Sequence, residues 1–376
     1  MSKILFPTTT FYPVKIGGPN FTLFWHCREL VKNNIGVEII STDSGFDTLK
    51  GQHPPVNSSE STAMGNISYV SGRFKLLRQI CQFYSSLNKV DVIHLNSFFS
   101  PISLACFLLI ILFNRNKKIV WSTRGELNAQ ALRYSTIKKK VIISGMKYLV
   151  SKVTFHSTSS QETADIQKCL KTKSIFQIEN LMDLEEKRET IREKRLLYIG
   201  RIHPIKNIES LIEGVGNSFS FRNTNYTLLI VGDCEGRHKG YLESLKKLVI
   251  GKGLEEKVKF TGHKEGLEKQ DIYASSRFTF LPSHSENFGN VVIESMAQGT
   301  PVVASKGTPW KILRLSKAGF HVENDPKTLA NTVDRIIGMD EDEYNVYSRN
   351  CYSCVSEKFD IRYRIDEWID IYRNHR

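Results

Sequence analysis

Short apolar runs alternate with helix-length amphipathic stretches through the first half of the chain. The β-branched runs at residues 37–40, 90–93 and 118–121 are separated by stretches long enough for a helix. Residues 1–9 are typical of a first buried strand, because their apolar run is too short for a secretion signal. This alternation favours βαβ units around a parallel sheet. We therefore expect a Rossmann-like domain over residues 1–183.

The alternation starts again after residues 183–194, which are charged and poor in apolar side chains. The strands expected in the second half cover residues 195–200, 226–232, 258–262, 278–281 and 301–304. The pattern predicts a second doubly wound α/β domain over residues 184–358, and an amphipathic terminal helix within residues 359–376.

Length and composition agree with a two-domain globular protein. The chain has 376 residues, more than one compact core usually holds, with 40% hydrophobic and 24% charged residues. Its seven scattered cysteines, an odd number, favour a reducing compartment, so we expect the protein in the cytoplasm. The longest apolar run, residues 102–113, is shorter than the roughly 20 residues that a membrane-spanning helix needs.

Positive charge is concentrated in the first half. Residues 1–183 hold 22 Lys and Arg against 11 Asp and Glu, whereas residues 184–376 hold 30 against 28. Nucleic acid, an anionic membrane surface, a phosphorylated acceptor or plain solubility could each explain this bias.

One basic stretch, residues 133–152, combines cations with apolar residues as an interfacial helix does. The cations are Lys138, Lys139 and Lys140; the apolar residues are Ile137, Val141, Ile142, Met146 and Leu149. We expect this helix to lie on an anionic membrane surface. The alternative is that its apolar residues face the core and its lysines only solvate the surface.

Residues 283–304 carry the densest chemical pattern. Glu286 lies in the expected loop after the strand at 278–281, and Glu294 lies in the second turn of a helix expected over residues 290–298. Ligands of open α/β sheets bind at the carboxyl ends of strands, and the amides of Asn290 and Val291 at the helix start would attract phosphate.

A second pattern, residues 200–207, follows the first strand of the second half. Arg201 and Lys206 are expected beside the same crevice, where a guanidinium and an ammonium could hold a diphosphate without a metal ion. The only Asp-x-Asp string, Asp340-Glu-Asp342, is expected to be a solvated helix start. We therefore expect neither a metal site nor a cofactor.

Together these motifs resemble the retaining GT-B glycosyltransferases of group 1, which include enzymes of bacterial lipopolysaccharide, capsule and exopolysaccharide synthesis. The matching segments are Gly17-Gly18, Asp91-Val-Ile-His-Leu95, Thr123-Arg-Gly-Glu-Leu127, Ile178-Glu-Asn180, Leu197-Tyr-Ile-Gly-Arg201 with Lys206, the Glu286/Glu294 pair, and Thr308-Pro-Trp-Lys311. The resemblance implies two Rossmann-like domains facing a central cleft: an acceptor-binding domain and a nucleotide-sugar domain. The terminal helix would pack back toward the first domain.

The resemblance also implies roles for individual residues. Glu286 would approach the donor sugar, Glu294 the ribose, and Arg201 and Lys206 the diphosphate. The implied donor site further includes Gly17, Gly18, Phe288, Gly289, Asn290 and Val291.

The chain departs from the family after the Val-Ile-His strand. Many relatives have a second histidine there, whereas this chain has Asn96, which can bond a hydroxyl but cannot titrate. Asn96, Arg124 and Glu126 are expected to contact the donor or the acceptor, and His94 is expected to point into the sheet.

The resulting hypothesis is a metal-independent retaining glycosyltransferase. It would transfer a sugar from a nucleotide-sugar donor to a glycan, expected to be lipid-linked, on the inner face of the cytoplasmic membrane. A sugar-nucleotide epimerase of similar architecture is the rival enzyme. A nucleic-acid-binding protein is a weaker alternative, because residues 137–143 lack the stacking aromatics that such proteins place among their cations.

Overall fold

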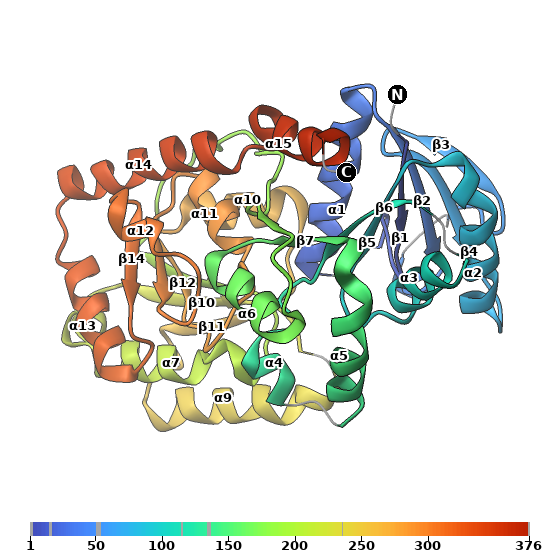
Figure 1. Cartoon of the computed structure of the whole chain (residues 1–376). Coiled ribbons are helices and arrows are strands. Elements are labelled where there is room, and N and C mark those ends of the chain that lie inside the picture. Colours follow the sequence, from blue (N-terminus) through green and yellow to red (C-terminus); the bar gives the residue numbers. More distant parts are fainter. Residues whose placement is uncertain are drawn as a thin grey trace. The chain divides into compact units, whose positions relative to one another are not determined.

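The computed structural model describes residues 3–14, 17–49, 54–113, 116–133, 137–234 and 236–374 (Figure 1). The chain divides into two compact units. Unit 1 contains Met1–Asp183 together with Ile361–Arg376, and unit 2 contains Leu184–Asp360.

Unit 1 is built on an eight-stranded sheet in the order β3-β4-β2-β1-β5-β6-β7-β8. Every strand pair is parallel except β3 and β4, which form an antiparallel hairpin at the edge. The strands are β1 (Lys3–Pro7), β2 (Gly36–Thr42), β3 (Ser59–Thr62), β4 (Gly65–Val70), β5 (Val92–Asn96), β6 (Lys118–Ser122), β7 (Val153–Ser157) and β8 (Ile175–Gln177).

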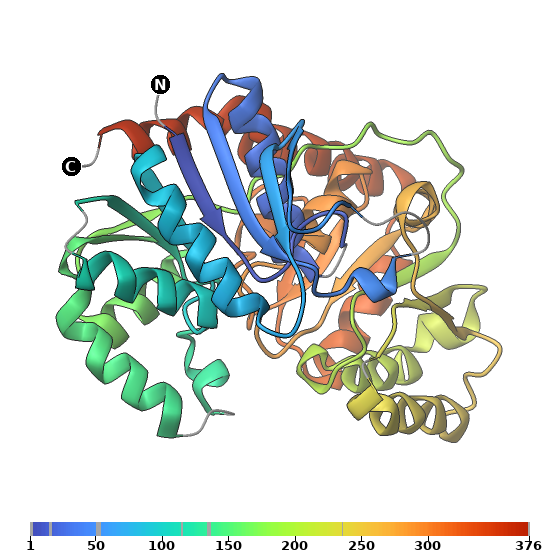
Figure 2. The ribbon, with the colours of Figure 1, turned by 90° about the vertical axis from the view of Figure 1, so that its right-hand side faces the viewer.

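Helices cover both faces of this sheet. They are α1 (Gly17–Lys32), α2 (Lys75–Ser86), α3 (Pro101–Leu112), α4 (Ala129–Arg133), α5 (Ile137–Leu149), α6 (Ser160–Leu170) and α15 (Ile361–Asn374). Three short 3-10 helices complete the unit, η1 (Phe46–Thr48), η2 (Leu87–Lys89) and η3 (Val150–Lys152). Side chains of α1 and α15 share one core with the sheet, while those of α2, α3, α5 and α6 share the other. Figure 2 shows light-blue α2 and teal α3 crossing the sheet on the same side.

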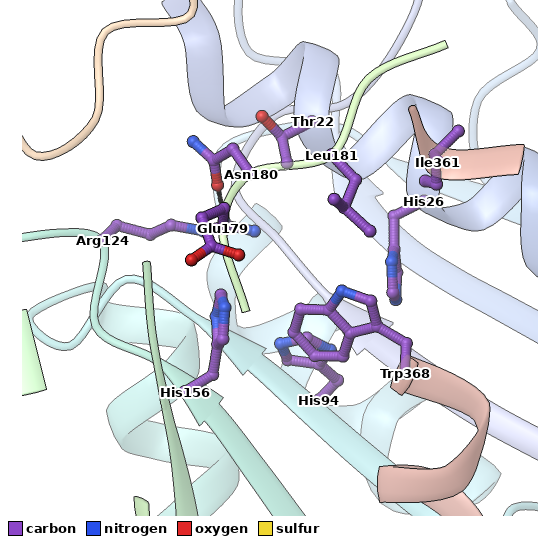
Figure 3. A pocket seen from close by; sticks show the side chains of 10 residues that line it. All are labelled: Thr22, His26, His94, Arg124, His156, Glu179, Asn180, Leu181, Ile361 and Trp368. Carbon is purple, nitrogen blue, oxygen red and sulfur yellow. Dashed lines mark hydrogen bonds between the residues drawn. The ribbon is translucent and has the colours of Figure 1, made fainter. Parts of the chain in front are cut away.

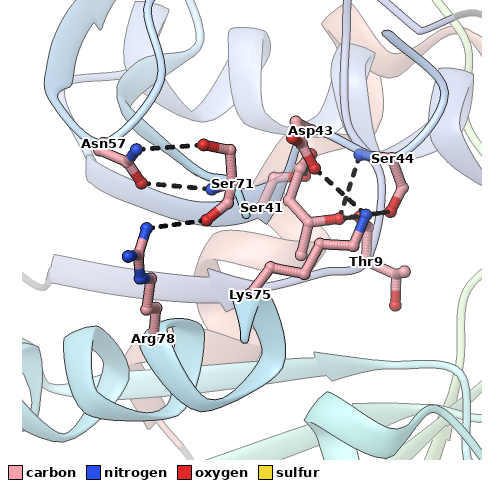
Figure 4. A network of polar contacts seen from close by, with 9 residues as sticks. Thr9, Ser41, Asp43, Ser44, Asn57, Ser71, Lys75 and Arg78 are labelled. Carbon is pink, nitrogen blue, oxygen red and sulfur yellow. Dashed lines mark hydrogen bonds and ion pairs between the residues drawn. The ribbon is translucent and has the colours of Figure 1, made fainter. Parts of the chain in front are cut away.

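A polar network joins the strand ends of β2 and β4 to the start of α2 (Figure 4). Lys75 Nζ donates to Asp43 Oδ1 at 3.2 Å and to Ser44 Oγ at 2.8 Å. The side chain of Asn57 bonds to Ser71 through both its amide nitrogen and its oxygen. These bonds satisfy the polar groups of two loops that have no sheet partner, and so fix the edge of the sheet.

Unit 2 contains a six-stranded parallel sheet in the order β11-β10-β9-β12-β13-β14. The strands are β9 (Arg195–Ile199), β10 (Thr227–Val231), β11 (Val258–Gly262), β12 (Phe278–Leu281), β13 (Val302–Ser305) and β14 (Gly319–Val322). The helices are η4 (Pro204–Lys206), α7 (Ile208–Asn217), α8 (Phe219–Asn223), η5 (Gly236–His238), α9 (Lys239–Gly251), α10 (Gly266–Ser275), α11 (Val291–Ala297), α12 (Ile312–Leu315), α13 (Pro326–Ile337) and α14 (Glu341–Phe359).

The expected fold class of two doubly wound α/β domains is confirmed. The Asp-x-Asp string stands at a helix start: Asp340 is the N-cap of α14, and its carboxylate accepts a hydrogen bond from Glu343 N at 2.8 Å. Helix α14 ends at Phe359, and the chain then enters α15 of unit 1, where Ile361 N donates to Met182 O at 2.9 Å.

Candidate active site

The strand order of unit 2 reverses between β9 and β12. These strands are parallel neighbours, with Tyr198 opposite Phe280, but the chain continues from β9 to β10 on one side and from β12 to β13 on the other. The helices that follow such strands cover opposite faces, which leaves a crevice at the carboxyl ends. The loops at 200–207 and 282–289, which carry the two sequence patterns, both leave this edge.

These two loops are bonded to each other. His284 N donates to Ile205 O at 2.9 Å, and the amide of Asn207 donates to Pro282 O at 3.3 Å and to Asn324 O at 2.9 Å. Asn207 takes a left-handed backbone conformation, φ 52°, which asparagine tolerates better than most residues. The loops therefore form one fixed rim.

Lys206 and Glu286 meet across this rim as an ion pair. Only 16% and 12% of the two side chains is exposed. Ser283 Oγ donates to the same carboxylate oxygen of Glu286 at 2.8 Å. An ion pair that is mostly buried and has an additional hydrogen bond is well ordered. The ammonium of Lys206 and the carboxylate of Glu286 therefore have fixed positions.

Arg201 lies beside the pair and is exposed. Its carbonyl accepts a hydrogen bond from the hydroxyl of Tyr198 at 2.9 Å, which anchors the first residues of the loop after β9. Burial raises the pKa of Tyr198 well above its usual value, so this hydroxyl remains a donor.

Glu294 has two partners on α10 that the sequence reasoning missed. Tyr273 Oη donates to Glu294 Oε2 at 2.8 Å, and Lys269 Nζ lies 2.7 Å from the same oxygen. Lys269 and Tyr273 are four residues apart on one helix, a spacing that puts them on one face and could have indicated the pair. Helix α11 begins at Val291, so Glu294 lies in its first turn and not, as expected, in its second.

The loop before α11 has a structural function besides any contact with a ligand. The side chain of Phe288 is buried against Trp310 and Phe359. Gly289 has φ 91°, and a Cβ there would lie 2.9 Å from Leu281 Cδ2, so glycine is required. Asn290 precedes the helix as its N-cap residue.

Unit 1 gathers the remaining predicted residues at the carboxyl edge of its own sheet. Asn96 ends β5, and Arg124 lies in the turn after β6, where its guanidinium donates to Asn96 Oδ1 at 2.7 Å and 3.2 Å. Glu126 accepts from Ser97 Oγ at 2.7 Å and Phe99 N at 2.8 Å, so it holds the loop after β5. Gly17 and Gly18 open α1.

Behind this edge lies a buried chain of hydrogen bonds that sequence reasoning did not find; Figure 3 shows its three histidines around Trp368. It runs through His26, Tyr372, His94, Ser122 and His156, with successive donor–acceptor distances of 2.7, 2.7, 2.7 and 2.8 Å. Trp368 of α15 lies against all three histidine rings. The chain fastens the terminal helix to strands that are more than 200 residues earlier in the sequence.

The partners set one direction for the protons in this chain. His156 Nε2 must donate to the carbonyl of Ile178, at 2.8 Å, so its Nδ1 accepts from Ser122. Ser122 Oγ then accepts from His94 Nε2, whose Nδ1 accepts from Tyr372. Burial lowers the pKa of His156 to about 3 and that of His94 well below its usual value, so each ring is neutral.

The described ranges lack both a metal-binding cluster and a membrane-spanning helix. They contain no group of three or more His, Cys, Asp or Glu side chains placed to hold a metal ion. They also contain no helix long and apolar enough to cross a bilayer.

Comparison with known proteins adds to this geometry. The family described as "Glycosyl transferases group 1" matches residues 182–352, which include both rim loops, Lys206, Glu286 and Glu294. This segment is similar to the group 1 glycosyl transferases, and it covers a little less than half of the chain. A D-inositol 3-phosphate glycosyltransferase of Acidothermus cellulolyticus is 30% identical to the chain over 147 residues, covering 38% of the chain and 33% of that relative. The alignment thus spans about a third of the relative's length.

Solved structures extend the likeness from the group 1 segment to the whole chain. HepE of Anabaena, solved in complex with UDP and glucose, superposes with a TM-score of 0.76 at 19% identity, covering 99% of this chain and 100% of HepE. Sucrose-phosphate synthase of Thermosynechococcus elongatus gives 0.75 at 18% identity, covering 99% and 98%. The chain therefore has the GT-B fold.

Proposed function

We propose that the protein is a retaining glycosyltransferase that needs no metal ion. Unit 2 would bind a nucleotide-sugar donor, and unit 1 would bind a glycan acceptor that is lipid-linked. The observation that carries the proposal is the Lys206–Glu286 pair, held on two bonded loops at the strand-order reversal of a group 1 segment.

Chemically, departure of the sugar leaves negative charge on a diphosphate. Arg201 and Lys206 can neutralise that charge as it develops, because both are placed before the reaction begins. Glu286 would face the sugar and Glu294 the ribose. The name of the Acidothermus relative and the UDP and glucose bound to HepE support a nucleotide-sugar reaction of this class.

Thermal unfolding in the presence of a panel of nucleotide sugars tests donor binding. A donor at 100 times its dissociation constant should stabilise the protein by about 2.7 kcal/mol. Lys206→Ala should lose this protection, while Lys306→Ala, which removes an exposed lysine of the same unit, should keep it. Protection by no nucleotide sugar, or equal protection of both variants, would contradict the assignment.

Product analysis separates transfer from epimerisation. We expect a transferred sugar whose anomeric configuration matches that of the donor, formed at the same rate after treatment with a chelator. A nucleotide sugar with an inverted ring carbon, formed without an acceptor, would instead identify the rival epimerase.

Helix α5 supports a membrane location with two of the expected apolar residues, Ile137 and Val141, and with Tyr148, which was not expected. Met146 is buried in the core, whereas Ile137, Val141 and Tyr148 are 80%, 64% and 85% exposed. Their spacing puts them on one stripe of the helix. Of the three lysines, Lys138 and Lys140 are exposed.

Lys139 points elsewhere: its ammonium lies over the ring of Phe99, 4.7 Å from the centroid. An apolar stripe with a lysine on each side fits an anionic lipid surface, which accepts both kinds of group.

Helices α2 and α3 extend this apolar surface on the same side of the sheet. The helices pack together, and the rings of Tyr84 and Phe113 lie 5.2 Å apart. The exposed apolar residues are Phe74, Leu76, Leu77, Tyr84, Leu108, Leu112 and Phe113. Because α2, α3 and α5 bury their inner faces in one core, their outer faces point to the same side.

Liposome sedimentation tests this surface. Each lysine near an anionic leaflet contributes about 1 kcal/mol, so Lys138→Gln with Lys140→Gln should weaken binding roughly 30-fold. The matched control, Lys246→Gln with Lys247→Gln, removes the same charge from α9 of unit 2 and should change little. Equal binding to neutral and anionic vesicles would overturn the proposed surface.

A further inference from the structure

Arg124 is a cation surrounded by neutral partners. Its guanidinium donates to the amide oxygen of Asn96 at 2.7 Å and 3.2 Å. It also donates to the amide oxygen of Asn180 at 3.4 Å, and Figure 3 shows these two side chains. Within the described residues no carboxylate lies close enough to form an ion pair with it. Burial is the largest influence on the pKa of Arg124 and lowers it, while the charge of Glu162 offsets this only in part.

The nearest carboxylates are occupied by other donors. Glu162 accepts from Thr123 Oγ1 and Gly125 N through one oxygen, and from Thr158 through the other, at 2.6–2.8 Å. Glu179, which lines the same pocket, pairs with Arg364 at 3.1 Å. Neutralising Arg124 would require one of these carboxylates to give up its present bonds.

The loop that carries Arg124 is held in a demanding conformation. Arg124 has φ 55° and Ser97, in the facing loop, has φ 67°, both in the left-handed region that side chains disfavour. The bonds from Glu162 to Gly125 N and from Glu126 to Ser97 Oγ maintain these loops. Strain of this kind persists where surrounding bonds impose it, and it places the guanidinium at the strand ends.

Asn96 adds an unused donor next to the cation. Its Oδ1 accepts from Arg124, which leaves Nδ2 directed away from the guanidinium, and this nitrogen is buried without any hydrogen-bond partner. Arg124 and Asn180 also line a small cavity of about 10 Å³, which has room for roughly one oxygen-sized atom; Asn96 does not line it. Buried donors without partners are costly, and so are buried charges without a counter-ion.

We infer that Arg124, Asn96 and Asn180 bind one oxyanion, a phosphate or a carboxylate, carried by the sugar acceptor. One oxygen of the anion accepts from Asn96 Nδ2, and the anion supplies a charge that pairs directly with Arg124. That the anion belongs to the acceptor rests on the proposed function, in which Arg201, Lys206, Glu286 and Glu294 of unit 2 hold the charged and ribose parts of the donor. That an oxyanion binds here does not depend on it.

Binding of inorganic phosphate, measured as a shift in the thermal unfolding of unit 1 at constant ionic strength, tests the oxyanion site. The wild-type chain should show a saturable increase in Tm. Arg124→Gln should weaken the phosphate affinity at least tenfold, while Arg73→Gln, which removes an exposed guanidinium of the same unit, should leave it unchanged. An identical phosphate response in all three proteins would overturn the site.

Asn96→Asp provides a second, opposite test. It places a carboxylate where Arg124 now has only an amide, so we expect a higher Tm than the wild type without phosphate, and no phosphate response. If Asn96→Asp instead lowers the Tm and phosphate still raises the Tm of this variant, Arg124 does not form part of an anion-binding site.

Donor affinity distinguishes the two sources of the oxyanion. Arg124→Gln should bind the nucleotide-sugar donor as tightly as the wild type, whereas Lys206→Ala should not. Equal weakening of donor binding in the two variants would assign the anion to the donor diphosphate and overturn the acceptor assignment, although phosphate would still bind. If the wild-type protein binds no nucleotide-sugar donor, the proposed function is wrong, but phosphate binding still supports an oxyanion site.

Discussion

The two units place a cation at the same kind of position and surround it differently. In unit 2, Lys206 follows β9 and is paired with Glu286. In unit 1, Arg124 follows β6 and has only amide oxygens as partners. The paired cation must exchange or share its partner when a ligand arrives, whereas the unpaired one gains its first counter-ion. If the proposed oxyanion site exists, an anion should therefore change the electrostatics of unit 1 more than those of unit 2.

The buried histidines of the two units also differ. Low pH should therefore reduce the stability of unit 1 much more than that of unit 2, and this is the largest effect that we expect. Burial lowers the pKa of His26 and His156 to about 3 and that of His94 well below its usual value, all in unit 1. Between pH 6.5 and 3 the unfolded chain binds protons that folded unit 1 cannot, so stability is complete above pH 6.5 and is lost as the pH falls.

At pH 5 this loss is about 2 kcal/mol for each histidine, or about 6 kcal/mol for the three. We therefore expect unit 1 to unfold at a lower temperature than unit 2 at pH 5, as two calorimetric transitions. Unit 2 has one partly buried histidine with a lowered pKa, His321, and should change less. A single transition that shifts uniformly with pH would contradict this difference.

The second comparison concerns catalysis. Lys206→Ala and Arg201→Ala should each lower turnover roughly 10²–10³-fold, because each removes a charge placed to stabilise the leaving diphosphate. Folding should survive, which circular dichroism can check. Near-normal turnover in either variant would remove that residue from the diphosphate site.

A third prediction separates a structural carboxylate from a reactive one. Glu162→Gln replaces an acceptor oxygen by a donor facing other donors, so it should destabilise unit 1 by about 1–3 kcal/mol in urea unfolding. Glu286→Gln should leave the free energy of unfolding nearly unchanged and reduce turnover. If the two variants lose equal stability, Glu286 is also a structural residue.

The smallest effect is expected at Glu294. Glu294→Ala should weaken donor binding roughly tenfold, the value of about one hydrogen bond to a charged group, while the chemical step stays close to normal. Glu286→Ala should do the reverse. Single-turnover kinetics with a measured donor affinity decides between them, and equal loss of affinity in both would contradict the division of roles.

The architecture of each unit followed from local pattern. The sequence alone predicted the strands and helices, the charged segment near residue 183, and the loop and helix around Glu286. Each of these features depends on residues that are close together in the chain. The spacing of Glu286 and Glu294 was sufficient to place one in a loop and the other on a helix. The sequence also showed the excess of positive charge in the first half. It did not show which lysine side chains are exposed to solvent.

The tertiary structure decided which side chains meet. Lys206 and Glu286 are 80 residues apart, and Tyr372 lies 278 residues from His94. The spacing of apolar residues within one helix or strand therefore cannot predict either contact. The same holds for Lys139 turning to Phe99, for Lys269 reaching Glu294, and for the lack of an ion pair to Arg124 among the described residues. Contacts of this kind arise because the strand order brings loops that are distant in sequence to one edge of the sheet. The partners and the burial of a charged side chain are therefore set only when the sheet has formed.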